Sequence, residues 1–179
     1  NKVIIAGEVR GDGDLVNVNK EAIEQIVRDV IKSIGYEQET FHWKDVDISI
    51  NLHAQSEDIS RGVDAYKKNE EGAGDQGIMF GYATNETDVY MPCPIKLSHE
   101  LLKEIRNKRM NKEILGLGPD AKSQFSIKYK NGKPYDLHSI VLSIQHEKSL
   151  SSKNIKEMVL PIIEKVVPKN WSLPIENIF

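Results

Sequence analysis

The sequence predicts an α+β fold, in which helices pack on mixed or antiparallel sheets. Stripes of apolar residues at helical spacing recur between strand-like runs along the 179 residues. One pair of strand-like runs is joined by Asn131-Gly132, a turn signal typical of an antiparallel hairpin. An apolar content of 39% and a charged content of 28% fit a soluble globular protein of one domain, or of one domain and a part.

The first part of the chain predicts a strand, a helix and a second strand. Residues 2–9 carry the apolar run of a buried strand. Apolar residues then recur at helical spacing between Asn19, a suitable N-cap, and Gly35, which can end a helix. Residues 46–52 alternate between apolar and polar side chains, which is the pattern of a half-buried strand.

Residues 55–71 are polar, lack any periodicity and lead directly into a glycine-rich stretch. A polar loop of this length inside a compact domain is unusual, and such loops are commonly lids, binding loops or linkers. We favour a mobile lid over residues 57–71, with a plain linker as the alternative. The half-apolar run 78–82, just after the glycines, predicts a further strand.

The second half of the chain predicts a helix, the hairpin and a last helix. Ser98 is a candidate N-cap for the first of these helices, which should end before Gly116. The hairpin covers residues 125–144. An apolar stripe over 155–166 predicts the last helix, and Pro161 should kink it or mark its restart. A partial strand is expected at the end of the sequence.

Composition and charge argue against several classes of partner. The net charge of −3 gives no electrostatic case for nucleic acid or an anionic membrane. No apolar run is long enough to span a bilayer, and no signal peptide is visible. The single cysteine, Cys93, rules out an internal disulfide and suits a reducing cytoplasm, so we expect a cytoplasmic protein with an inert thiol. The five histidines lack metal-ligand spacing, and no metal site is assigned.

The ends of the sequence lie inside apolar, strand-like runs. It starts at Asn1 directly before the run at 3–6 and stops at Phe179 after Ile178. A lone strand leaves its backbone and its apolar face unpaired. We therefore expect a fragment of a longer protein, or a long chain represented in part.

Three short segments could carry chemistry. Residues 72–77 read Gly-Ala-Gly-Asp-Gln-Gly, where the glycines allow close backbone approach and Asp75 can point a carboxylate into a site. Asp120 and Lys122, two residues apart at a strand start, share a face; the carboxylate can accept from a ribose hydroxyl or an amine, and the ammonium suits phosphate. Glu8 follows a buried strand and a glycine, and could bind an ammonium group. An ordinary turn, an ordinary strand-start pair and a surface glutamate are the respective alternatives.

Residues 72–87, Gly-Ala-Gly-Asp-Gln-Gly-Ile-Met-Phe-Gly-Tyr-Ala-Thr-Asn-Glu-Thr, closely resemble the signature of the S-adenosylmethionine synthetase family. The resemblance continues through Met91-Pro92 to Ile95. Residues 119–124 and 141–146 also resemble the corresponding family strands. The resemblance covers essentially the whole chain, from Val3 to Phe179, and implies the α+β fold of that family.

The resemblance implies an enzyme that forms S-adenosylmethionine from ATP and L-methionine with Mg²⁺ and K⁺, and that works as a homodimer or homotetramer. It implies that residues 1–71 end the N-terminal domain, including the lid, and that 72–179 form the central domain. By the same resemblance, Glu8 and Asp75 bind methionine. The segment implied to contact ATP comprises Asp120, Ala121, Lys122 and Ser123.

Arg61 stands at the start of the lid, where many family members carry a glutamine that helps to bind methionine. Arginine cannot accept a hydrogen bond. The resemblance therefore assigns Arg61 to methionine with the exception that it cannot replace the acceptor of that glutamine. Binding to phosphates, or simple exposure to solvent, are the alternatives for Arg61.

Parts of the family's catalytic apparatus would lie outside this sequence. The His-Pro-Asp-Lys segment, with a catalytic histidine and a magnesium-binding aspartate, would precede Asn1, and a glycine-rich phosphate segment would follow Phe179. No catalytic residue is therefore assigned, and the 179-residue chain alone is expected to be inactive. A non-catalytic regulatory or scaffold subunit of the same family is the alternative function, and an unrelated nucleotide-binding domain is the third.

Overall fold

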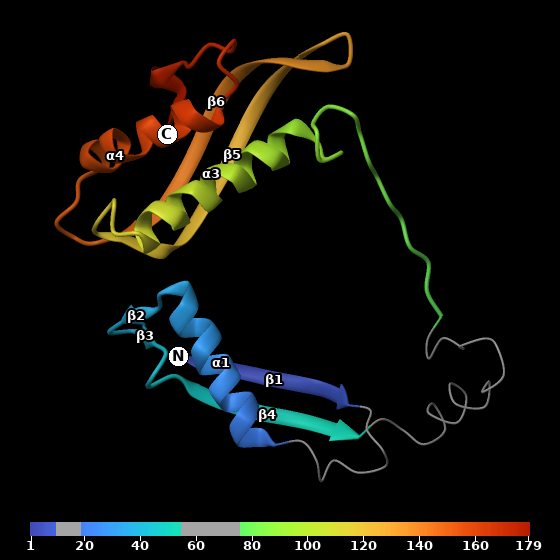
Figure 1. Ribbon diagram of the computed structural model, residues 1–179, viewed down its shortest axis with the longest axis vertical. Helices are drawn as coiled ribbons and strands as arrows, with labels where there is room; N and C mark the ends of the chain where they lie inside the picture. The colour runs from blue at the N-terminus through green and yellow to red at the C-terminus, as the bar shows by residue number, and fades with distance from the viewer. Residues whose placement is uncertain (10–18, 55–75) are drawn as a thin grey trace. The chain divides into compact units, whose positions relative to one another are not determined.

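The computed structural model describes residues 1–9, 19–54 and 76–179. The chain divides into two compact units, Asn1–Phe80 and Gly81–Phe179. Figure 1 shows a helix with a small sheet in the first unit, and two helices with a long hairpin in the second. The mixture of helices, a parallel pair and antiparallel pairs is the α+β arrangement that the sequence predicts. The proposed domain boundary between residues 71 and 72 stays a prediction.

In the first unit, β1 (Lys2–Val9) pairs in parallel with β4 (Asp47–Ala54). Helix α1 (Lys20–Ile34) connects them in sequence, and two short strands, β2 (Glu37–Gln38) and β3 (Phe41–His42), form a small hairpin after it. Both predicted ends of α1 are confirmed. The side chain of Asn19 accepts a hydrogen bond from the Ala22 amide, and Gly35 ends the helix at a φ of 97°.

The first unit buries few apolar side chains. Among its described residues only Ile31 of α1 and Val46 are buried, and only Val46 is fully buried. Trp43 is half-buried in this unit: its ring is 4.5 Å from the Lys32 ammonium, and its indole N–H donates to Glu37. We therefore expect the first unit to be the less stable of the two.

The second unit is built on a long antiparallel hairpin of β5 (Leu117–Lys130) and β6 (Lys133–His146). The turn at Asn131-Gly132 has positive φ at both residues, 51° and 72°, which confirms the predicted turn. Helices α3 (Cys93–Met110) and α4 (Ser152–Val166) and the short 3₁₀ helix η2 (Ile175–Asn177) complete the unit.

Both helices pack on one face of the hairpin, around one apolar cluster (Figure 1). Leu101 of α3, Ile163 of α4, and Leu137 and Ile140 of β6 are fully buried in it. The other face of the hairpin is covered by no helix of this unit, so β5 and β6 alternate between core-facing and exposed residues.

Two predictions need correction, the start of the helix before the hairpin and the strand over 78–82. Ser98 does not cap α3: the helix begins at Cys93, behind Pro92, and Ser98 lies within it and donates to the Pro94 carbonyl. Proline is tolerated in a first helical turn because the N–H that it lacks has no helical partner there. Pro161 lies inside α4, which is continuous from Ser152 to Val166, so of the two outcomes predicted for it the restart is excluded and the kink stays a prediction.

The strand predicted over 78–82 is also wrong. Residues 76–84 adopt neither helix nor strand, and Ile78, Met79 and Phe80 are 81%, 92% and 89% exposed. A strand requires a neighbour for its backbone hydrogen bonds, and no described segment pairs with this one. The expected partial strand at the end of the sequence is present: Phe179 donates to Ile140 and accepts from Leu142, parallel to β6.

Candidate functional site

Strand β5 places the predicted nucleotide segment on two faces. Asp120 and Lys122 are exposed on the face that the helices leave uncovered, as their two-residue spacing predicts. Ala121 and Ser123 are half-buried on the helix side. Within the described part of the chain, neither the Asp120 carboxylate nor the Lys122 ammonium has an ion-pair partner, so both charges are available to a ligand.

Ser123 has a structural contact. Its hydroxyl donates to the Ser98 carbonyl at 2.8 Å and so ties β5 to α3. The family resemblance assigns Ser123 and its neighbours to one ATP-contacting segment. The structure separates that segment into an exposed pair and a core-facing pair. A hydroxyl already engaged with a helix carbonyl has less capacity for a ligand than the free charges beside it.

The hairpin register adds residues from β6 to the uncovered face. Lys122 pairs directly with Ser143, and Gln124 pairs with Val141. We call this surface the open face; its exposed members are Asp120, Lys122, Gln124, Val141, Ser143 and Gln145. A carboxylate, an ammonium, a hydroxyl and two amides on one side of a sheet can bind a phosphate and hydrogen-bond a polar sugar or base.

Ser143 and Gln145 were missed as site residues by sequence reasoning. The run 141–146 supported only the family resemblance there. The turn signal could have indicated them, because a known turn fixes which residues face each other across a hairpin. Two irregularities near the turn, however, shift the register. Counting outward from the turn without them would place Lys122 opposite Val141 instead of Ser143.

In the first unit, Glu8 lies near the end of β1, opposite His53 of β4. The Glu8 Oε1 atom is 3.8 Å from His53 Nε2, and His53 Nδ1 is 3.0 Å from the Gly7 carbonyl. Both side chains are about half exposed. A carboxylate in this position can accept a cationic group from solution. Asp75, Arg61 and the predicted lid 57–71 lie outside the described residues.

A second polar cluster is centred on Glu86, within the 72–87 signature, and was not predicted. The Glu86 Oε2 atom accepts a hydrogen bond from the Tyr129 hydroxyl at 2.7 Å and from the Cys93 amide at 3.0 Å. The hydrogen bond from the Cys93 amide, and to a smaller extent that from Tyr129, lower the pKa of Glu86. Burial and then the bond to Glu86 raise the pKa of Tyr129 well above its usual value. Glu86 thus fastens the start of α3 to β5.

The buried thiol of Cys93 agrees with the inert role predicted for it. Its side chain is 5% exposed, and burial is the main cause that raises its pKa, so the reactive thiolate is disfavoured.

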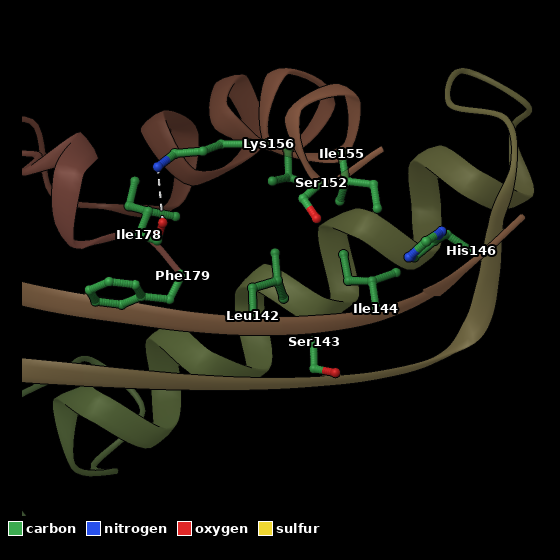
Figure 2. Close-up of a pocket in the computed structure, with 10 residues that line it drawn as sticks. Leu142, Ser143, Ile144, His146, Ser152, Ile155, Lys156, Ile178 and Phe179 are labelled. Carbon is green, nitrogen blue, oxygen red and sulfur yellow. Dashed lines mark hydrogen bonds between the residues drawn. The ribbon is translucent and has the colours of Figure 1, made fainter. Parts of the chain in front are cut away.

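A pocket of about 370 Å³ lies between α4 and the second half of β6 (Figure 2). Its apolar lining includes Leu142, Ile144 and Ile155, and Lys156 at its rim donates to the Ile178 carbonyl. Figure 2 shows Leu142 and Ile144 on the helix side of β6 and the Ser143 hydroxyl directed away from the pocket. The pocket opens mainly on the helix side of β6, and Ser143 is the one member of the open face in its lining, which includes neither Asp120 nor Lys122.

Metal ligands are not gathered in the described residues. Over 1–9, 19–54 and 76–179, no three histidine, cysteine, aspartate or glutamate side chains are placed so that they could hold a metal ion. In the same ranges, no helix is both long and apolar enough to cross a membrane.

Comparison with known proteins gives one consistent result. Residues 70–178 match the family profile described as S-adenosylmethionine synthetase, central domain. An S-adenosylmethionine synthase of Parvibaculum lavamentivorans is 48% identical over 179 residues, which is 100% of this chain and 45% of the relative. One of Bradyrhizobium diazoefficiens is 51% identical over 178 residues, with 97% of this chain and 44% of the relative covered.

A solved structure is also similar. The structure described as an unusual S-adenosylmethionine synthetase from Campylobacter jejuni has a TM-score of 0.75 and 30% identity. The match covers 100% of this chain and 46% of that one. The chain spans about 45% of the length of the first curated relative.

Proposed function

This chain belongs to the S-adenosylmethionine synthetase family, and from that premise we propose that it is part of a methionine adenosyltransferase. The reaction proposed for the complete enzyme joins ATP and L-methionine to form S-adenosylmethionine, and releases phosphate and pyrophosphate. The methionine sulfur attacks C5′ of the ribose, and the triphosphate leaves. The protein must therefore stabilise a departing polyanion and align a neutral nucleophile.

The open face is the observation that carries the proposal for this chain. Asp120 and Lys122 stand side by side there, exposed and without ion-pair partners among the described residues. Lys122 would neutralise charge on the triphosphate, and Asp120 would accept a hydrogen bond from a ribose hydroxyl. Ala121 and Ser123 complete the proposed ATP segment from the helix side, with Ser123 fixing the strand to α3.

Methionine is proposed to meet the other candidate carboxylates. Glu8 would accept the substrate ammonium group at the end of β1, where it lies opposite His53. Asp75 is also proposed to bind methionine. Arg61 is proposed to contact methionine as well, although arginine cannot accept a hydrogen bond. Residues 57–71 are proposed to close over the site, and the complete enzyme to be a cytoplasmic homodimer or homotetramer.

Mg²⁺ and K⁺ are the metals that the family implies. The described residues do not fit such a site, because they bring no metal-binding group of acidic or histidine side chains together. No step is therefore assigned to a metal through this part of the chain. We also propose that the 179-residue chain has no turnover alone, since it corresponds to less than half of the relatives' length.

The test uses the full-length enzyme with Lys122→Met, which removes the cation and keeps much of the stem. A charge-assisted contact contributes about 1.5–3 kcal/mol, so we expect ATP use or the chemical step to weaken by about tenfold or more. Lys130→Met, at the far end of the same strand, is the matched control and should retain wild-type kinetics. Asp75→Asn should mainly impair methionine use.

Wild-type kinetics for both substrates in the Lys122 and Asp75 variants would make these residues structural. The unaltered full-length protein is assayed with ATP, L-methionine and Mg²⁺, and the product is sought by chromatography. If no S-adenosylmethionine forms, the proposed enzymatic activity is refuted and a non-catalytic regulatory or scaffold subunit is favoured.

A further inference from the structure

The strand that carries Asp120 is irregular directly before this residue. From Phe125 down to Ala121, β5 pairs residue by residue with β6, ending at Ala121 opposite Ile144. The next pair is Leu117 opposite His146. Gly118, Pro119 and Asp120 therefore face only one residue of β6, which is Gln145. Such a bulge redirects the side chains next to it.

The side chain of Gln145 fills the space over Gly118. A Cβ atom on Gly118 would lie 2.5 Å from Gln145 Oε1, 2.7 Å from its Cδ and 2.8 Å from its Cγ. The φ angle of Gly118 is outside the left-handed region, so the backbone does not require glycine there. A side chain at position 118 would therefore have to displace the flexible side chain of Gln145.

The same amide reaches the backbone of Asp120. Gln145 Oε1 accepts a long hydrogen bond, 3.4 Å, from the Asp120 N–H. Pro119 has no N–H, so Asp120 provides the first amide donor after Gly118. One side chain therefore contacts both ends of the bulge.

We propose that Gln145 is a positioning residue that holds the Gly118–Asp120 bulge and thereby directs the Asp120 carboxylate beside Lys122. The positioning depends on the geometry of the hairpin alone; its consequence for ATP rests on the proposed function. Gln145 does not act on the reacting atoms. It sets the backbone from which Asp120 projects.

The first test measures amide exchange of Asp120 by NMR in the 179-residue chain. Gln145→Leu removes the acceptor and keeps the bulk, and should speed Asp120 exchange by about two- to tenfold, the range for one net hydrogen bond. Gln145→Glu keeps an oxygen acceptor and should restore protection. Gln124→Leu is the matched control, an amide on the same face without contact to Gly118, and should leave Asp120 exchange unchanged.

The second test is a double-mutant cycle. Gly118→Ala should displace Gln145 and speed Asp120 exchange like Gln145→Leu, and the double variant should be no faster than either single one, because both remove the same contact. Additive effects, or unchanged Asp120 exchange in Gln145→Leu, would overturn the proposal. If Gly118→Ala does not fold, the comparison of Gln145→Leu, Gln145→Glu and Gln124→Leu decides alone.

An enzymatic arm separates this inference from the proposed function. In the full-length enzyme, Gln145→Leu should raise KM for ATP several-fold and leave KM for methionine unchanged, with Gln145→Glu partly restoring it. If Asp120 exchange responds while neither Gln145→Leu nor Lys122→Met changes ATP kinetics, the positioning stands and the function assigned to the open face fails. If Lys122→Met impairs ATP use but Gln145→Leu leaves the amide exchange of Asp120 unchanged, the positioning role of Gln145 is refuted and the proposed ATP-binding function of the open face stands.

Discussion

Ile140→Val tests whether the two units respond separately to a change in the larger core. Ile140 is fully buried in the cluster shared by the hairpin and both helices, and the substitution removes one methylene while keeping a β-branched side chain. Such a change costs about 0.5–1.5 kcal/mol. A unit of about 100 residues loses about 4–8 °C per kcal/mol, so a loss of 1 kcal/mol should lower its midpoint by that amount.

Each unit contains one tryptophan, which gives a separate signal for each. Trp43 lies in the first unit, and Trp171 packs against the core of the second. The assay is fluorescence-detected urea and thermal unfolding in two backgrounds, Trp43→Phe and Trp171→Phe. Ile140→Val should lower the midpoint seen by Trp171 and leave the midpoint seen by Trp43 unchanged.

The chemically identical change Ile4→Val is the control. Ile4 is 62% exposed, so this change should move neither midpoint by a measurable amount. Equal shifts at both tryptophans after Ile140→Val would show that the chain unfolds as one cooperative body, and would refute the separation of units. An unshifted Trp171 midpoint would instead refute the burial assigned to Ile140.

Three further outcomes can be measured in the same way. Hydrogen bonds from Ser172 and then the ion pair with Lys128 lower the pKa of Asp136. Ionised Asp136 therefore stabilises the folded state above its unfolded pKa of 3.8, and this stabilisation is lost as the pH falls below that value. Asp136→Asn should accordingly flatten the acid limb of second-unit stability between pH 4 and about 2. Glu86→Gln weakens the bonds to the start of α3, and should lower the Trp171 midpoint without moving that of Trp43. Gly35→Ala, at a φ of 97°, should cost the first unit about 1–2 kcal/mol in the Trp43 signal.

Local patterns predicted most of the elements. Apolar spacing identified α1 with both of its caps, and the Asn131-Gly132 turn identified the hairpin. These features depend on residues a few positions apart in sequence. The start of α3 was misplaced because its first amide is satisfied from a distance, by Glu86, and no local capping pattern indicates such a bond.

The candidate site was predictable to a similar degree. The two-residue spacing of Asp120 and Lys122 predicted that both lie exposed on one face, as they do. Their partners across the hairpin were not, because bulges decide whether Ser143 or Val141 faces Lys122. Bulges arise from the whole ladder and its packing, so a single strand does not indicate them. Glu8 and His53 were likewise brought together only by strand pairing over a long sequence separation.

The alternation along β5 separates what this strand must preserve from what it can change. Core-facing Ser123 and Phe125 secure the strand to the rest of the unit, whereas Asp120 and Lys122 contribute nothing to the buried cluster. Replacing both charges would leave the packing intact while removing the ligand contacts proposed for them. A descendant could thus lose its chemistry in two substitutions and persist as a folded, non-catalytic partner of an active copy.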